Sequence, residues 1–210
     1  MFYSCPLCLS PNQNFAFKGE FTHCLVCDLI FRAPKASFTG LGEKKHYLLH
    51  QNGPQHDGYV SFLKRAIDPI ETHLLPNLQA LDFGCGPGPA INYILQSYQI
   101  SCDNYDPFFF PEGIKEKSYD FIFATECVEH FFHPNQEFEK ILGLLKVGGY
   151  LSMMTEIHPG LNKINDWYYI KDATHVSLYS EKTFMWIALK YKLKLEYTDQ
   201  KRVVVFRKTG

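Results

Sequence analysis

The chain has 210 residues, which is enough for one α/β domain and a small appendage. Hydrophobic residues make up 46% and charged residues 20% of it, a balance that excludes a disordered chain, and the net charge of −1 offers no overall field for nucleic acid or an anionic membrane. Neither a signal peptide nor an apolar run of about 20 residues is present, so we expect a cytoplasmic protein without membrane contact.

Two cysteine pairs dominate residues 1–35. Cys5 and Cys8 form one CxxC knuckle, and Cys24 and Cys27 form a second one fifteen residues later. Each knuckle places two thiolates on one side of a turn, so two knuckles complete a tetrahedron. The total of seven cysteines is odd, which suits metal binding better than a disulfide framework. The pattern predicts a zinc ribbon over 1–35 with a structural Zn²⁺, and fortuitous free cysteines are the alternative.

A stretch rich in Gly, His and Lys follows over residues 36–57. It is punctuated by turn formers, so we predict a linker or lid. Tyr47 and His50 in this stretch, and Tyr59 on the helix after it, are candidates for covering a ligand. An ordinary polar linker would look much the same.

Regular periodicity begins at Gly58 and defines a domain over 58–210. Alternating strands and helices of this length predict an α/β fold, Rossmann-like, with a mostly parallel sheet, helices on both faces and an antiparallel terminal strand. In chain order we expect a helix over 58–75, a strand over 78–83, a helix over 90–98, strands over 100–105 and 119–125, a helix over 134–145, a strand over 150–155, a helix over 181–191, and a hairpin of 193–197 with 202–206.

A glycine-rich turn follows the first strand of this domain and opens a helix. Gly84, Gly86 and Gly88 let the backbone turn sharply and approach a ligand, and the helix N-terminus directs free N–H groups to the same place. The next strand ends at Asp106, 24 residues after Asp82. A carboxylate at that strand end can accept hydrogen bonds from both ribose hydroxyls.

Three stretches resemble the class I S-adenosylmethionine-dependent methyltransferases. Leu81–Gly88 is similar to their motif I, Tyr119–His130 to their fourth strand and its loop, and Leu144–Gly149 to the entry of their fifth strand. With the ribbon, the order resembles small-molecule enzymes of the ubiquinone-biosynthesis O-methyltransferase and sugar C-methyltransferase type. The alternatives are a nicotinamide or flavin domain, or a glycine turn with no ligand.

The resemblance implies S-adenosylmethionine as cofactor, S-adenosylhomocysteine as product, and a role for each matching position. The three glycines and the acidic Asp82 would lie at the methionine side, and Asp106 at the ribose. Thr125 and Glu126 would line the floor near the reactive methyl group. Tyr59 lies on the helix that folds over the cofactor in relatives.

One segment departs from the family pattern. Only twelve residues separate Asp106 from Tyr119, which is too short for the helix and strand that most members place there. The usual acidic residue that recognises adenine is therefore missing or displaced. We hypothesise that an aromatic side chain of 108–110, such as Phe108, covers the adenine, and three core phenylalanines are the alternative.

Candidate residues for proton transfer lie after the fourth strand and in a long insertion. His130 is a candidate general base or substrate ligand, with Glu129 orienting it, since histidine is the commonest base in proton transfer. His175 is the second candidate and ends an aromatic insertion over 156–176 that is too long for a plain connection. Helix-capping or helix-entry histidines are the alternatives.

The methyl acceptor is predicted to be a small molecule that offers an oxygen, carbon or nitrogen atom. Residues 1–35 are not basic, with Lys18, Arg32 and Lys35 against Glu20 and Asp28, so nucleic acid is an unfavourable partner for the ribbon and a docking or substrate-gating role suits it better. The rival functions are an RNA methyltransferase that grips RNA with the ribbon, and a cofactor-binding protein without turnover. The sequence does not define the oligomeric state.

Overall fold

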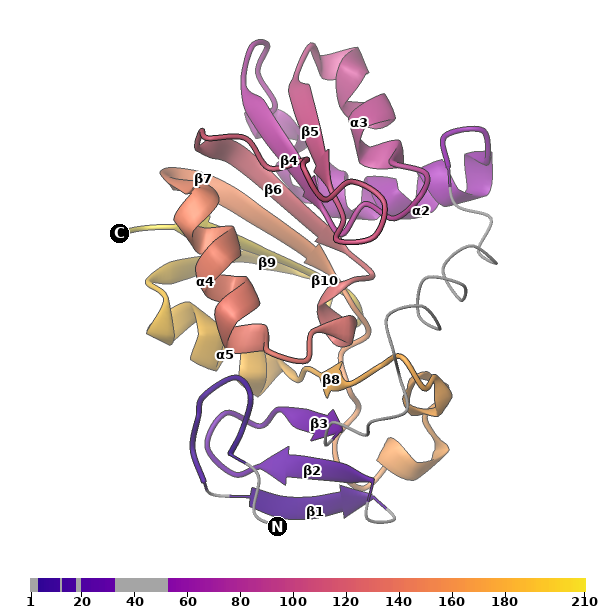
Figure 1. The fold of residues 1–210 in the computed structure, drawn as a ribbon, viewed down its shortest axis with the longest axis vertical. Helices are drawn as coiled ribbons and strands as arrows, with labels where there is room; N and C mark the ends of the chain where they lie inside the picture. The colour runs from indigo at the N-terminus through magenta and orange to yellow at the C-terminus, as the bar shows by residue number, and fades with distance from the viewer. Residues whose placement is uncertain (1–3, 12, 18–19, 33–52) are drawn as a thin grey trace.

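The computed structural model describes residues 4–11, 13–17, 20–32 and 53–210. Their strands form two sheets, one below the other in the view of Figure 1. The larger sheet has six strands and the smaller one has four. Most of the predicted linker, with Tyr47 and His50, lies outside the described residues. None of the described helices combines the length and the apolar character that a membrane crossing would need.

The six-stranded sheet has the order β5-β4-β6-β7-β10-β9. Its first four strands are parallel, and β10 runs antiparallel to both β7 and β9. The prediction of a mostly parallel α/β sheet with an antiparallel end is therefore confirmed. The strands are β4 (Gln79–Phe83), β5 (Ser101–Tyr105), β6 (Tyr119–Thr125), β7 (Leu145–Met154), β9 (Leu193–Thr198) and β10 (Val203–Lys208).

Helices cover both faces of this sheet. α2 (Asp57–Ile67) and α3 (Ala90–Leu95) pack on one face, and α4 (Pro134–Leu144) and α5 (Glu181–Lys190) pack on the other (Figure 1). The central strand β6 contributes apolar side chains to both cores, because residues 121–124 are all buried. A near-continuous apolar run is what a parallel strand with two covered faces requires.

Two predicted boundaries differ from the structure. The helix expected over 58–75 ends at Ile67 and continues as a 3₁₀ turn over Asp68–His73, because Pro69 supplies no N–H for an α-helical hydrogen bond. The strand expected from residue 150 already begins at Leu145, directly after α4. Leu145 pairs with Tyr119 before an irregularity in the register, so Gly148 and Gly149 lie inside the strand rather than before it.

Residues 107–118 contain no helix and no strand that joins the sheet. Phe110 instead folds back on Asp106 through an isolated bridge, with N–H···O distances of 3.2 and 2.9 Å. Gly113 lies so close to β5 that a Cβ atom there would be 1.7 Å from the Asn104 carbonyl oxygen. The prediction that this segment is too short for a helix and a strand is confirmed, and β5 is consequently an edge strand of the six-stranded sheet.

The smaller sheet joins the N-terminal region to the insertion after β7. It consists of β1 (Gln13–Phe17), β2 (Phe21–Cys24), β3 (Ile30–Arg32) and β8 (Ser177–Leu178), in that order. Ile30 pairs with Leu178 and Phe31 with Ser177, although these residues are far apart in the sequence. The cysteine region also shares the hydrophobic core of α4 and α5. The two parts are therefore packed into one body.

Candidate active site

The glycine turn after β4 has the backbone conformation that the sequence pattern predicts. Gly84 and Gly86 both have positive φ angles, 78° and 63°. A Cβ atom on Gly84 would be 2.5 Å from Cβ of Cys127, whereas one on Gly86 would have nothing within 4 Å. Gly84 is thus needed for packing, and Gly86 leaves an open space for a ligand. Gly88 lies further along, two residues before α3.

Asp106 ties the second strand end to this turn. Its Oδ2 accepts a hydrogen bond from the Gly86 N–H at 3.1 Å, and its Oδ1 accepts from Phe108 and Phe109 at 2.8 and 3.1 Å. The side chain is only 7% exposed. One carboxylate therefore fixes both the glycine turn and the aromatic loop that carries Phe108.

Asp82, at the end of β4, is buried with an unsatisfied oxygen. Its side chain is 2% exposed, and its Oδ1 has no hydrogen-bond partner among the described residues. Burial, and then the charge of Asp106, raise the pKa of this carboxyl group to about 8. A buried polar atom without a hydrogen-bond partner is costly. This site would be stabilised by a ligand that brings a positive charge or a hydrogen-bond donor.

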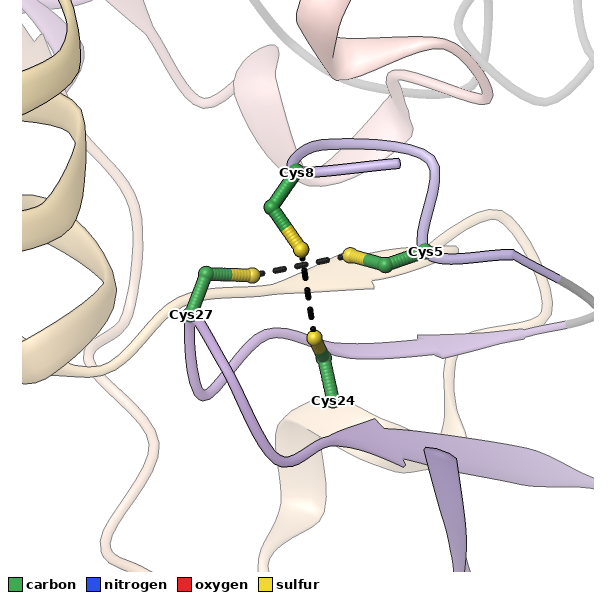
Figure 2. A group of neighbouring side chains, drawn as sticks. All are labelled: Cys5, Cys8, Cys24 and Cys27. Carbon is green, nitrogen blue, oxygen red and sulfur yellow. Dashed lines mark hydrogen bonds between the residues drawn. The ribbon is translucent and has the colours of Figure 1, made fainter. Parts of the chain in front are cut away.

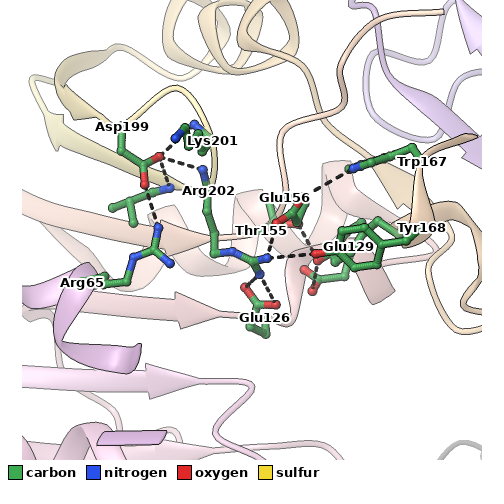
Figure 3. A network of polar contacts seen from close by, with 12 residues as sticks. Arg65, Glu126, Glu129, Thr155, Glu156, Trp167, Tyr168, Asp199, Lys201 and Arg202 are labelled. Carbon is green, nitrogen blue, oxygen red and sulfur yellow. Dashed lines mark hydrogen bonds and ion pairs between the residues drawn. The ribbon is translucent and has the colours of Figure 1, made fainter. Parts of the chain in front are cut away.

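Glu126 follows β6 with a positive φ of 50° and is held by an arginine. Its two oxygens lie 2.8 and 2.7 Å from Nη1 of Arg202, which also binds Glu156 and Tyr168 (Figure 3). Burial and the charge of Glu129 raise the pKa of Glu126 to about 8, although Arg202 opposes the shift. Arg202 is not identified by the sequence analysis, because no motif around it in the chain indicates a site.

The three candidates for proton transfer come together in space. Glu129 and His130 lie in a short 3₁₀ helix after β6 (Val128–His130), and His175 lies just before β8. The two imidazole rings are 5.1 Å apart, centroid to centroid. One potential ligand atom from each of the three residues lies within 4.8 Å of the other two.

Each member of this trio has a protein partner that orients it. Nδ1 of His130 lies 3.0 Å from the Thr174 carbonyl oxygen, and Nδ1 of His175 lies 2.7 Å from that of Tyr169. The Tyr169 hydroxyl donates to Glu129 Oε1 at 2.5 Å. Because carbonyl oxygens only accept, both Nδ1 atoms carry a proton, which leaves Nε2 of each ring to face other groups.

Burial shifts the pKa values of His175 and Glu129. It lowers the pKa of His175 to about 4, and the nearby His130 adds to this effect. It raises the pKa of Glu129 to about 7, against the hydrogen bond from Tyr169. At neutral pH His175 is therefore an uncharged base.

Most of these groups line one cleft with a volume of about 1000 Å³. This size lies at the upper end of small-molecule sites. Of the predicted residues, the cleft is lined by Tyr59, Gly84, Gly86, Asp106, Phe108, Thr125, Glu126, Glu129, His130 and His175. Asp82 and Gly88 do not line it. Groups that the sequence reading did not assign to a site complete the wall, namely Cys127, Phe131, Lys171, Thr174 and Arg202.

The four N-terminal cysteines form a separate cluster (Figure 2). Sγ of Cys5 lies 3.5 Å from that of Cys27, and Sγ of Cys8 lies 3.4 Å from that of Cys24. All four sulfurs lie within 4.8 Å of one another. A tetrahedral Zn²⁺ with bonds of about 2.3 Å would place its sulfurs about 3.8 Å apart, so the donor set and spacing fit this ion.

The two knuckles repeat one backbone pattern. The N–H of Leu9 donates to the Cys5 carbonyl at 2.9 Å, and the N–H of Asp28 donates to that of Cys24 at 3.0 Å. Leu9 and Asp28 both have positive φ angles, 63° and 66°. Such strained conformations persist where the surrounding structure stabilises them.

Comparison with known proteins identifies the family. Residues 50–198 match the model of a family described as a methyltransferase domain. The chain belongs to this family. The matched range contains every residue that lines the cleft except Arg202, so the prediction of a methyltransferase is confirmed at this level. No curated protein sequence matches the chain significantly.

Solved structures, one of them a methyltransferase, share the fold. A Burkholderia thailandensis 1,6-didemethyltoxoflavin-N1-methyltransferase, with bound 1,6-didemethyltoxoflavin and S-adenosylhomocysteine, matches with a TM-score of 0.54 and 12% identity, over 95% of this chain and 100% of its own. The Pyrococcus horikoshii protein PH0226 matches with a TM-score of 0.54 and 13% identity, over 79% and 99%. At such low identity, these matches establish the fold alone.

Proposed function

We propose that this enzyme transfers the methyl group of S-adenosylmethionine to a small molecule and releases S-adenosylhomocysteine. The observation that supports this most strongly is the meeting, in one cleft, of the glycine turn and Asp106 with Glu129, His130 and His175. The first set suits the cofactor and the second faces the space that remains for an acceptor.

The cofactor end of the proposal rests on three features of the chain. Gly86 leaves room beside the backbone, Asp106 offers carboxylate oxygens for ribose hydroxyls, and Asp82 has a buried oxygen that lacks a donor. The α-amino group of S-adenosylmethionine would supply that donor. Phe108, on the short loop after β5, is proposed to cover the adenine in place of the missing acidic residue.

The acceptor end is proposed to align the nucleophile and to receive its proton. The sulfonium already activates the methyl group, so alignment of donor and acceptor is the main task of the protein. His130 and His175 are the candidates for removing a proton from an acceptor oxygen, carbon or nitrogen, and Glu129 is a candidate for holding His130 in place. The toxoflavin methyltransferase shows that this fold can hold a small ring-bearing acceptor beside S-adenosylhomocysteine.

The cysteine cluster is proposed to hold a structural Zn²⁺ within a ribbon over 1–35, next to a methyltransferase domain over 58–210. All four ligands come from the protein, which leaves no open position for chemistry. Asp28, beside Cys27, accepts a hydrogen bond of 2.6 Å from Ser180, the N-cap of α5, and its carbonyl lies 3.3 Å from His158. These contacts support a docking role for the ribbon.

The RNA alternative gains no support from the basic C-terminal hairpin. Lys208 donates to the carbonyl oxygens of Leu142 and Leu145, and Lys194 pairs with Glu196. These lysines therefore stabilise β9 and β10, and lysine on an edge strand such as β9 also prevents pairing with another chain.

Calorimetric titration with S-adenosylhomocysteine tests the proposal. We expect micromolar binding by the full chain and a loss of about 100-fold in Asp106→Ala, since two charge-assisted hydrogen bonds are worth about 3 kcal/mol. Asp103→Asn is the matched control. Asp103 lies on β5, the strand that Asp106 follows, and contacts Tyr119 and Lys117, so this variant should bind normally. Absence of binding by the folded wild type would overturn the function.

A second measurement separates the acceptor classes. Formation of S-adenosylhomocysteine would be followed with a panel of small hydroxyl, amine and activated-carbon acceptors, and with total RNA. Turnover with RNA that falls steeply with salt would favour the RNA alternative instead. Cofactor binding without turnover on any acceptor, and without an effect of His130→Ala or His175→Ala, would favour a binding protein.

A further inference from the structure

Glu129, His130 and His175 form a side-chain group of the kind that binds metal ions. Two imidazoles and one carboxylate converge, with one ligand atom of each within 4.8 Å of the others. Three protein ligands leave open coordination positions, and this donor set is typical of mononuclear transition-metal sites. The group is distinct from the cysteine cluster, which has only sulfur donors.

The orientation of the two histidines fits metal binding. In metal sites a histidine usually donates its second ring N–H to a carbonyl or carboxylate, which fixes the ring and its tautomer. His130 and His175 both do so through Nδ1, at 3.0 and 2.7 Å from backbone carbonyl oxygens. The ring of His175 also packs against that of Tyr169, with centroids 3.9 Å apart.

The carboxylate supplies an independent observation. Glu129 is 1% exposed, and its Oε2 has no hydrogen-bond partner among the described residues. The other oxygen is held by the Tyr169 hydroxyl, which itself lies 3.2 Å from Oγ1 of Thr155. A buried carboxylate oxygen of this kind costs free energy unless a cation or a donor meets it.

The backbone holds the two halves of the group together. The N–H of Val176 donates to the Glu129 carbonyl oxygen at 2.8 Å, so His175 and Glu129 are fixed in register. The side chains therefore do not depend on a mobile loop for their convergence. This preorganisation favours binding.

We propose that Glu129, His130 and His175 bind a divalent transition-metal ion, and that this ion holds an oxygen atom of the methyl acceptor. The second half rests on the proposed methyl transfer. The acceptor class is then a hydroxyl compound with a neighbouring oxygen, because two open positions favour a chelating pair of oxygens. Bound to a divalent cation, the hydroxyl loses its proton to solvent more easily.

The transfer step is balanced without any further reactant. A lone pair of the acceptor oxygen forms the new bond to the methyl carbon, and the bond between that carbon and the sulfonium breaks. Its electron pair returns to sulfur, which leaves neutral S-adenosylhomocysteine. With the ion bound, the two histidines act as its ligands and the proton of the hydroxyl passes to solvent, which replaces the role as bases that they would have in the absence of a metal.

Metal counting on the full chain tests the site. The purified protein would first be saturated with Zn²⁺ at one equivalent, which fills the cysteine cluster, and then dialysed against Co²⁺ with elemental analysis of both metals. We expect one Co²⁺ per chain beyond the zinc. Glu129→Gln and His175→Ala should weaken Co²⁺ binding by more than 100-fold, and Tyr169→Phe by about 10- to 100-fold as an outer partner of the ligand.

His133→Ala is the matched control, because His133 lines the same cleft but is exposed at the start of α4. It should bind Co²⁺ like the wild type. Binding of S-adenosylhomocysteine, measured in parallel, reports that each variant is folded. The metal site alone is overturned if the wild type binds S-adenosylhomocysteine but takes up no second metal. It is also overturned if all variants take up Co²⁺ as the wild type does. Co²⁺ uptake without any S-adenosylhomocysteine binding overturns the proposed function instead.

Discussion

The cleft has two halves that the chain assembles from very different lengths of sequence. The proposed cofactor half, formed by the glycine turn and Asp106 with the buried Asp82 nearby on β4, lies within residues 82–110. In the acceptor half, His130 bonds to Thr174 44 residues away, and the segment with His175 is held by Arg32, 141 residues from Ala173. Local motifs fix the first half, whereas the second depends on long-range packing. Damage far from the cleft should therefore affect the two halves unequally.

The largest effect is expected from loss of the cysteine cluster. Cys8→Ser with Cys24→Ser should lower the free energy of unfolding by at least about 3 kcal/mol, or roughly 10 °C in Tm, because structural zinc contributes directly to folding. Thermal denaturation with and without a chelator would measure this. Cys102→Ser is the control, since Cys102 is buried on β5, outside the cluster. An unchanged Tm in the double variant would show that the cluster is not a structural zinc site.

The two glycines of the turn should separate stability from binding. Gly84→Ala combines a positive φ with a clash at Cys127 and should cost about 2–4 kcal/mol of stability. Gly86→Ala meets open space, so it should cost only about 1 kcal/mol but weaken S-adenosylhomocysteine binding at least tenfold. Denaturant titration and calorimetry distinguish the two effects. Equal behaviour of both variants would contradict the assignment of the open space to the ligand.

Asp82 should make cofactor affinity depend on pH. Its raised pKa of about 8 means that the free protein holds a proton there at pH 7, and a bound ammonium group would favour the ionised form. Binding then releases a proton, so affinity should rise by up to tenfold per pH unit from pH 6 and level off near pH 8. Calorimetry in buffers of different ionisation enthalpy counts the released proton. Asp82→Asn should bind more weakly and lose the slope, while a slope that survives this change would point to another group.

The smallest effect is expected from the contact between the N-terminal sheet and the segment that carries His175. Arg32 donates to the carbonyl oxygens of Ala173 and Ile170 at 2.9 and 3.4 Å. Arg32→Ala should speed amide hydrogen exchange in residues 168–178 several-fold, since each such bond is worth about 1 kcal/mol, and leave S-adenosylhomocysteine affinity unchanged. Arg65 lies on α2 and forms an exposed ion pair with Asp199, so Arg65→Ala is the control. A weakened cofactor affinity in Arg32→Ala would mean that the two halves are not independent.

Much of the fold was predictable because its signals are local. The apolar run of β6 and the glycines after β4 identify elements whatever surrounds them, and β6 has the predicted bounds. The apolar periodicity does not specify where a helix ends, since α2 stops before Pro69 while the periodicity continues beyond it. The short segment after Asp106 could be recognised as too small for another unit from its length alone.

The sequence by itself determined the methyltransferase class, the glycine turn after β4 and the four-cysteine pattern, because each depends on residues that are neighbours in the chain or on adjacent strands. Only the tertiary structure decided that β8 joins the N-terminal sheet, that Arg202 crosses to Glu126, and that His175 meets Glu129 and His130. No local pattern encodes these contacts, since they arise where separate layers pack against each other. The convergence of Glu129, His130 and His175 therefore depends on tertiary packing, whereas the glycine turn is specified by a local motif.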